Sequence, residues 1–169
     1  MQPQAEFYIE RLGLSVHPEG GYFKEIYRAL ESINETCLPV RYKESRNFST
    51  SIYFLLEGEQ TSQFHKLASD ELWHFYDGSS VNIFLIDNTG ELSIITLGRN
   101  ITQGEKFQCI IPAGCWFGAE LVDKKFFALV GCTVAPGFNF SDFVLSDKKG
   151  LIKEYPQHEA LINRLNRGK

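Results

Sequence analysis

Short apolar or alternating runs, each closed by Gly, Asn or Asp, follow one another from Ser51 to Val134. Runs of this length are typical of β-strands, and segments such as Asp87-Asn88-Thr89-Gly90 are typical of the turns between them. The pattern predicts strands near 51–57, 61–67, 71–77, 80–87, 91–98, 106–111, 115–121 and 125–134. Such even spacing favours an antiparallel sandwich or barrel over a parallel α/β sheet.

The regions on either side of this segment carry different patterns. Apolar residues at helical spacing over 5–12, followed by Gly13, predict a short N-terminal helix, and a similar pattern after Pro156 predicts a C-terminal helix. A strand is expected over 22–28, and the polar stretch 30–47 is expected to be a long loop or an edge hairpin. We therefore expect a single all-β domain over 1–169 with short terminal helices.

Two glycine-containing segments are expected to be turns or loops. In His17-Pro18-Glu19-Gly20-Gly21, proline fixes one backbone angle and the paired glycines permit conformations that a side chain would forbid. We expect His17 to hydrogen-bond within this turn. The segment from Gly137 to Asp142 combines glycine with aromatic residues but lacks the spacing of a phosphate-binding loop.

The overall charge and the cysteines limit the partners and the compartment. The formal net charge is −4, and the 17 Lys and Arg residues are scattered along the chain, so neither a nucleic acid nor a membrane surface is an expected partner. The four cysteines form no C-x-x-C pair and are expected to be reduced. Because the N-terminus lacks the pattern of a secretion signal, we expect a cytoplasmic protein.

His65 and Glu71 are the residues most suited to carry chemistry. They lie on two consecutive predicted strands, so a tight turn would bring an imidazole and a carboxylate together in a pocket. Alternate side chains of a strand share a face, which places Gln63 with His65, and Trp73 and Phe75 with Glu71. The same rule turns His74 away from this face unless a bulge changes the alternation.

Aromatic residues near these strands could form the apolar wall of a pocket. Trp73, Phe75, Trp116 and Phe117 could stack on a planar or sugar ring, and they could equally belong to the core. His65 and Glu71 also have a purely structural interpretation, as a buried hydrogen-bonded pair. We favour the pocket, because polar groups inside an apolar barrel are costly to keep.

Several segments resemble one known family. Gly58, His65, Glu71 and Gly78 are close to the first motif of the cupin superfamily, and Pro112-Ala113-Gly114 resembles the start of the second. The detailed sequence is similar to that of the Cupin_5, or DUF985, branch in residues 17–23, 52–56, 69–76 and 112–117. The resemblance implies a double-stranded β-helix, or cupin jelly-roll barrel, with a pocket in the barrel mouth. It also implies that the protein forms a homodimer.

The chain departs from the metal-binding pattern of that superfamily at two positions. The resemblance implies four ligands, but Leu67 and Phe117 occupy two of the histidine positions. His65 and Glu71 alone would hold a metal poorly, because transition-metal sites need three or four protein ligands. A three-ligand site would return only if His74 turned inward.

Three functional hypotheses follow. The first is a metal-free cupin that binds a small polar metabolite, such as a nucleotide, a nucleotide-sugar or a sugar-like compound. Its contacts would be Gln63, His65, Glu71, Trp73, Phe75 and Phe117. If it is an epimerase or isomerase, His65 is the natural general base and Glu71 would orient it. The second is a metalloenzyme holding Fe, Mn or Zn, and the third is a non-catalytic binding module.

Overall fold

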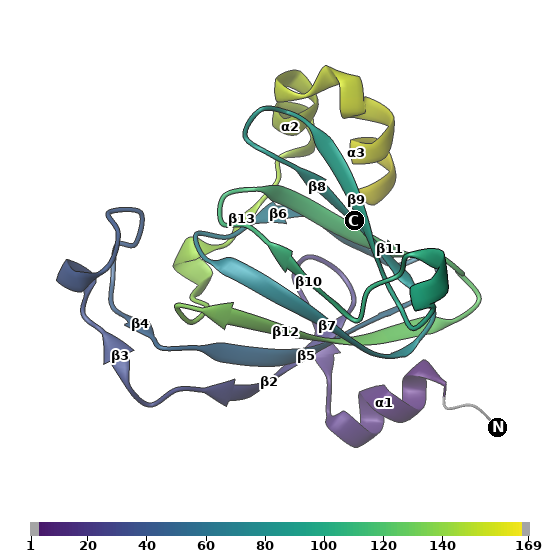
Figure 1. Ribbon diagram of the computed structural model, residues 1–169, viewed down its shortest axis with the longest axis horizontal. Coiled ribbons are helices and arrows are strands. Elements are labelled where there is room, and N and C mark those ends of the chain that lie inside the picture. The colour runs from purple at the N-terminus through teal and green to yellow at the C-terminus, as the bar shows by residue number, and fades with distance from the viewer. Residues whose placement is uncertain (1–3, 167–169) are drawn as a thin grey trace.

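The computed structural model describes residues 4–166, and its two large β-sheets pack face to face as a jelly roll (Figure 1). The six-stranded sheet has the order β1-β2-β5-β12-β7-β10, and the five-stranded sheet has the order β13-β6-β11-β8-β9. Neighbouring strands in both sheets are antiparallel. The all-β fold expected from the strand spacing is confirmed.

The main strands lie within about two residues of their predicted positions. Their bounds are β2 Tyr22–Arg28, β5 Thr50–Glu57, β6 Thr61–Lys66, β7 Asp70–Gly78, β8 Val81–Ile86, β9 Leu92–Leu97, β10 Gln108–Ile111, β11 Trp116–Leu121 and β12 Phe127–Ala135. The short strands are β1 Ser15–Val16, β3 Ser32–Ile33, β4 Arg46–Asn47 and β13 Val144–Leu145. Strands β3 and β4 pair with each other, so the polar stretch after β2 is an edge hairpin.

The three α-helices of residues 4–166 are short and lie outside the two sheets (Figure 1). Helix α1 (Ala5–Leu12) ends at Gly13, and α3 (Glu159–Leu165) follows Pro156, both as the sequence predicts. Helix α2 (Lys148–Glu154) was not predicted; its N-cap Asp147 accepts a hydrogen bond from the Gly150 N–H. Within residues 4–166, no helix is both long and apolar enough to cross a membrane.

The space between the sheets is filled by large apolar side chains from both of them. Phe54 and Trp73 come from the six-stranded sheet and Ile83 and Phe117 from the five-stranded one, and each is at most 1% exposed. A second cluster lies between the five-stranded sheet and helices α2 and α3. These helices therefore cover the outer face of that sheet, and its inner face points toward the six-stranded sheet.

A bulge in β6 decides which of its side chains face inward. Along the ladder with β11, Phe117 pairs with His65 and Ala119 pairs with Ser62, so β6 has one residue more than its partner. Gly118 stands opposite this bulge, where a Cβ would lie 2.9 Å from the Ser62 carbonyl oxygen. Ser62 and His65 are consequently on one face, although a regular strand would place them on opposite faces.

Candidate functional site

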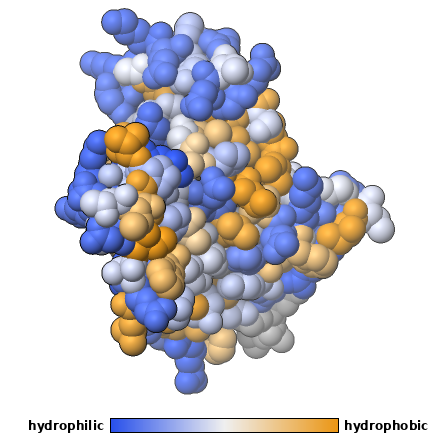
Figure 2. Space-filling view, turned by 60° about the vertical axis from the view of Figure 1, so that its left-hand side comes forward, coloured by the Kyte–Doolittle hydropathy of each residue, from blue (hydrophilic) through white to orange (hydrophobic). Residues whose placement is uncertain are grey.

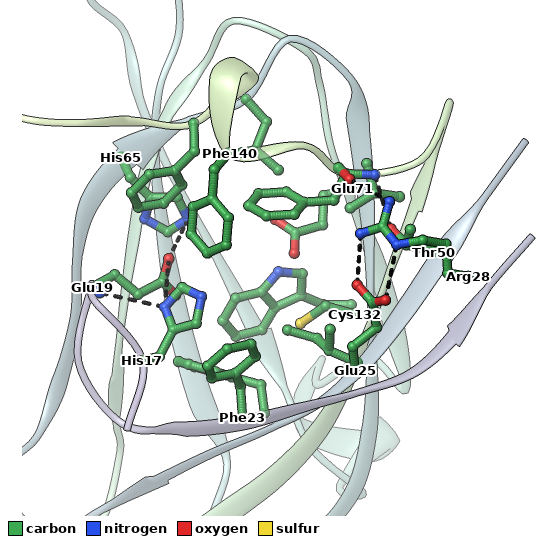
Figure 3. Close-up of a pocket in the computed structure, with 17 residues that line it drawn as sticks. His17, Glu19, Phe23, Glu25, Arg28, Thr50, His65, Glu71, Cys132 and Phe140 are labelled. Carbon is green, nitrogen blue, oxygen red and sulfur yellow. Dashed lines mark hydrogen bonds and ion pairs between the residues drawn. The ribbon is translucent and has the colours of Figure 1, made fainter. Parts of the chain in front are cut away.

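A cavity opens between the inner faces of the sheets, at the end where β2, β5, β6 and β7 lie close to the segment after β12 (Figure 3). It has a volume of about 80 Å³. Since one water needs about 10–15 Å³ on this scale, the space holds about five to eight atoms the size of a water oxygen. The polar side chains that line it are His17, Glu19, Glu25, Arg28, Thr50, His65 and Glu71.

Glu19 is the buried partner of His65. Its Oε2 lies 3.0 Å from Nε2 of His65, and its Oε1 accepts a hydrogen bond from the Ser62 hydroxyl at 2.8 Å. The turn that carries Glu19 packs so closely against β6 that a Cβ at Gly20 would clash with the Thr61 carbonyl. Gly20 has a positive φ of 114°, which also favours glycine. The turn therefore places Glu19 against the inner face of β6, the face to which the bulge turns His65.

The partners of His65 set its protonation. Nδ1 lies 2.7 Å from the Gln63 carbonyl oxygen, which can only accept a hydrogen bond, and Nε2 faces the Glu19 carboxylate. Burial would lower the pKa of His65, but Glu19 holds the pKa above its ordinary value. Burial would likewise raise the pKa of Glu19, but His65 holds it below its ordinary value. Both ring nitrogens thus face hydrogen-bond acceptors, and this arrangement favours the imidazolium, which has no lone pair free for the general-base role considered above.

Glu71 lines the cavity with one carboxylate oxygen unpartnered. Its side chain is buried, and Oε2 has no hydrogen-bond partner among the described residues. Burial raises the pKa of Glu71 to about 7, with the His65 imidazolium acting against that shift. Near neutral pH the Glu71 carboxyl can therefore either give or take a proton.

Trp73 supplies an unused donor beside Glu71. It is 1% exposed, and its Nε1–H has no hydrogen-bond partner in the described part of the chain. This N–H and the Cys132 thiol both lie near enough to Glu71 to oppose the rise of its pKa, although the Trp73 N–H does not reach the geometry of a hydrogen bond. A buried donor and a buried acceptor at one cavity, both unused, leave room for a ligand that satisfies both.

Three aromatic residues after β12 form part of the cavity wall. Phe138 and Phe140 have ring centroids 5.0 Å apart, and the Phe143 ring lies 5.3 Å from the His65 imidazole. All three line the cavity. We call residues 138–143 the aromatic flap. Residues 138–142 of this flap belong to the segment that the sequence marks only as a loop.

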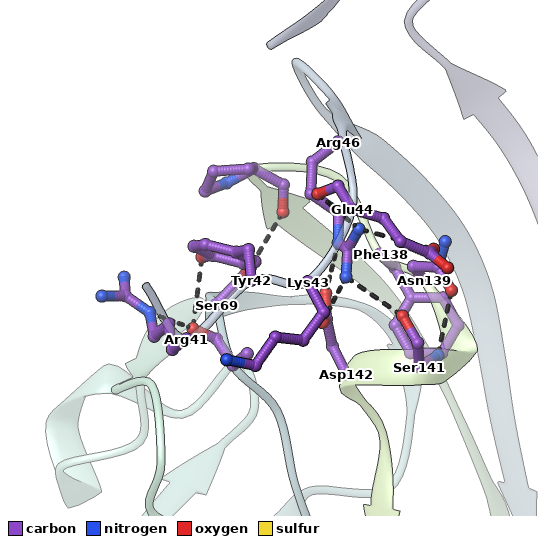
Figure 4. A network of polar contacts seen from close by, with 12 residues as sticks. Arg41, Tyr42, Lys43, Glu44, Arg46, Ser69, Phe138, Asn139, Ser141 and Asp142 are labelled. Carbon is purple, nitrogen blue, oxygen red and sulfur yellow. Dashed lines mark hydrogen bonds and ion pairs between the residues drawn. The ribbon is translucent and has the colours of Figure 1, made fainter. Parts of the chain in front are cut away.

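A buried ion pair anchors this flap to the hairpin (Figure 4). Arg46 on β4 donates from Nε and Nη2 to the two carboxylate oxygens of Asp142, at 2.6 and 2.5 Å. Its side chain is 1% exposed and that of Asp142 is 7% exposed. Arg46 also donates to the Ser141 hydroxyl, and its guanidinium lies over the Tyr42 ring. This bidentate geometry holds the flap in one position.

The structure places three of the predicted ligand contacts outside the cavity lining. The bulge in β6 turns the Gln63 side chain away from the cavity, and only its backbone carbonyl contacts a site residue, His65. Phe75 precedes a register shift in β7 and packs beside the core under the Arg99 guanidinium. Phe117 lies behind His65, with ring centroids 3.9 Å apart. His65, Glu71 and Trp73 do line the cavity.

The residues do not form the metal site considered above. His74 lies on the other face of β7, where its Nε2 is 3.4 Å from the Thr133 hydroxyl. Leu67 lines the cavity and Phe117 packs on His65, where the superfamily pattern would have histidines. Over residues 4–166, no group of three or more His, Cys, Asp or Glu side chains is arranged to hold a metal ion.

Several residues of the site were not singled out from the sequence. Glu19, Arg28 and the aromatic flap all reach the cavity from segments distant from His65 in the chain. The one available signal is the turn at residues 17–21, where a histidine and a glutamate stand beside paired glycines. His17 does bond within this turn, since its Nδ1 accepts from the Glu19 N–H.

Replacing Glu19 with Gln tests the ion pair. Without the carboxylate, burial acts on the imidazole with less opposition, so the pKa of His65 should fall. Titration of the imidazole ring protons by NMR measures this directly. A His65 resonance that titrates identically in both proteins would show that Glu19 does not hold the proton on His65.

The comparison with known families agrees with the fold. The family model described as Cupin superfamily (DUF985), Cupin_5, matches residues 6–146. The chain belongs to the Cupin_5 family. A relative of this Cupin_5 chain, the uncharacterized protein YML079W of Saccharomyces cerevisiae, is 30% identical over 136 residues, and the match covers 75% of this chain and 67% of that protein.

Solved structures similar to this Cupin_5 chain include two that align over nearly all of it. The crystal structure of protein SO0799 from Shewanella oneidensis is 38% identical with a TM-score of 0.90, covering 99% of this chain and 100% of that one. A hypothetical protein from Leishmania major is 34% identical with a TM-score of 0.85, covering 96% and 98%. Oxalate decarboxylase from Bacillus subtilis, at 16% identity and a TM-score of 0.55 over 89% and 36%, shares the fold alone.

Proposed function

We propose that this protein binds a small, uncharged polar metabolite in the cavity and moves a proton on it through Glu71, as an isomerase or epimerase does. The observation that carries the proposal is the buried Glu71 carboxyl, which has an unpartnered oxygen and a pKa of about 7. A group that titrates near the working pH is the most efficient proton donor and acceptor.

The charges of the cavity favour a sugar-like compound over a nucleotide or nucleotide-sugar. Arg28 and His65 are the positively charged side chains of the lining, and both are already paired. Arg28 donates to both carboxylate oxygens of Glu25, at 2.9 and 2.7 Å, and to Asn47 and the Phe138 carbonyl. A phosphate would have to enter without a free cation and close to Glu71, which is unfavourable.

The size of the cavity supports the same choice. Its volume of about 80 Å³ accommodates one small ring or a short chain, whereas a nucleotide-sugar is far larger. The aromatic flap and Phe54 supply apolar walls that can pack on the faces of such a molecule.

A thermal-shift screen tests the binding. The panel should pair each uncharged aldose, ketose, polyol or lactone with its phosphate ester, and the protein should be screened with and without the substitution Glu71→Gln. We expect uncharged compounds to raise the melting temperature of the natural protein and to lose much of that effect in Glu71→Gln. Stabilisation by the phosphate esters alone, or identical shifts in the two proteins, would contradict the proposal.

We also propose that a second copy of the chain is the protein partner. β1 pairs only with Tyr22 and Phe23 of β2, which leaves the rest of that strand as a sheet edge. Val16, Ile26 and Tyr27 are about half exposed or more on these strands. The face turned forward in Figure 2 shows hydrophobic patches among hydrophilic residues. Light scattering at micromolar concentration should give the mass of a dimer, and a monomer mass would contradict this.

A further inference from the structure

His17 is held as a neutral imidazole by the backbone of its own turn. Its Nδ1 accepts a hydrogen bond from the Glu19 N–H at 3.3 Å, so the ring proton resides on Nε2. Burial lowers the pKa of His17, and the neighbouring Glu19 only partly opposes this. At neutral pH His17 is therefore a hydrogen-bond donor through Nε2, without a positive charge.

The His17 ring cannot turn freely inside the cavity. It is 8% exposed and packs edge-on against Phe23 and Phe54, with ring centroids 4.5 and 5.9 Å away. Figure 3 shows its second nitrogen on the side of the ring that faces the cavity. Together with the unpartnered Trp73 Nε1–H, it gives the cavity lining two neutral donors in addition to the Glu71 carboxyl group.

We infer that the substrate is an uncharged carbonyl compound, such as a hydroxyaldehyde or hydroxyketone, and that neutral His17 donates its Nε2–H to the carbonyl oxygen. This inference rests on the proposed function and names its substrate class. Two N–H groups require an acceptor, and an oxygen that gains negative charge in the reaction is the acceptor they stabilise most. A neutral imidazole can serve in this way without giving up its proton.

The chemical step balances without any further reagent. The Glu71 carboxylate takes the proton from the carbon beside the carbonyl group, and the C–H electron pair forms a C=C bond. The π electrons of the C=O bond move onto oxygen, which accepts hydrogen bonds from His17 and Trp73. In D₂O the proton on Glu71 is replaced by a solvent deuteron, and return of that deuteron to the same carbon restores the carbonyl with exchange at that carbon.

The experiment follows the loss of carbon-bound protons by NMR in D₂O at pH 7. The probes are dihydroxyacetone and glyceraldehyde, each compared with its phosphate ester. We expect protein-dependent exchange with the uncharged probes and a drop of about 10²–10³-fold in His17→Phe, the usual effect of losing one such donor. His158→Phe is the matched control, since His158 binds the Gly90 carbonyl away from the cavity lining, and it should retain the exchange rate.

A second measurement covers the case in which His17→Phe does not fold. In the natural protein, nitrogen NMR of the histidine rings should show His17 protonated at Nε2 alone, and dihydroxyacetone should shift that resonance. Unchanged exchange in His17→Phe, protonation at Nδ1, or faster exchange of the phosphate esters would overturn the inference. If His17→Phe keeps the rate while Glu71→Gln loses it, only this inference fails. If no probe exchanges with the protein present, both proposals fail.

Discussion

Replacing Glu71 with Gln should slow protein-dependent exchange of the carbon-bound proton by about 10²–10⁴-fold, the usual contribution of a single acid–base group. The amide preserves the shape of the side chain but cannot take a proton at neutral pH. The measurement is the exchange rate of dihydroxyacetone in D₂O. Glu10→Gln, at an exposed position on α1, makes the same chemical change far from the cavity lining and should keep the natural rate.

An exchange rate within a factor of two or three of the natural one in Glu71→Gln would show that another group moves the proton. The result is interpretable only if the variant is folded. The structure predicts that it is, because Oε2 of Glu71 forms no hydrogen bond that the amide would break.

The same substitution should also change how stability depends on pH. The pKa of Glu71 is about 7 in the folded protein against an ordinary value of 4.5. The folded state therefore keeps a proton that the unfolded chain has lost, so the free energy of unfolding falls as the pH rises from 4.5 to about 7. At 1.36 kcal/mol per pH unit the fall is on the order of 3 kcal/mol.

Denaturant unfolding at several pH values measures this effect. The free energy of unfolding of Glu71→Gln should rise relative to that of the natural protein as the pH rises through this window. Above the window the difference between the two should stay constant. Equal pH dependence in the two proteins would show that the buried carboxyl does not bind its proton more tightly after folding.

The second large effect concerns the anchor of the aromatic flap. Arg46→Met removes one partner of a pair whose side chains are 1% and 7% exposed, and leaves the Asp142 carboxylate buried without its guanidinium. Breaking a buried pair in this way costs about 3–5 kcal/mol. The free energy of unfolding, measured with urea at pH 7, should fall by that amount.

Arg99→Met is the matched control for this prediction. Arg99 also pairs with an aspartate, Asp77, but its side chain is 62% exposed. Loss of an exposed pair costs at most about 1 kcal/mol. If the Arg46 and Arg99 variants lost the same stability, the Arg46 pair would not be the buried anchor of the flap.

Local patterns predicted most of the sheets. Most of strands β5 to β12 are separated by turns that contain Gly, Asn or Asp, and their alternation of apolar residues is visible in short windows. Helix α2 was missed because its sequence, with two lysines and Gly150 at its start, has little apolar periodicity.

The site was predicted less completely than the sheets, for two physical reasons. Bulges shift the alternation of side chains, and this removed Gln63 from the face of His65. Contacts between distant segments are invisible to local patterns, so the pairing of His65 with Glu19 rather than Glu71 could not be derived from spacing. The aromatic flap was missed for the same reason, because only the fold brings residues 138–143 to the cavity wall.

The titration of the Glu71 carboxyl carbon tests the central claim most directly. Protein labelled with ¹³C in glutamate can be followed by NMR from pH 4 to pH 9, with the Glu71 resonance assigned by its absence from Glu71→Gln. We predict a midpoint near pH 7, because burial without a hydrogen-bond partner disfavours the charged form. A midpoint near the ordinary value of 4.5 would mean that Glu71 is a permanently ionised carboxylate, and the proposed proton transfer would then be wrong.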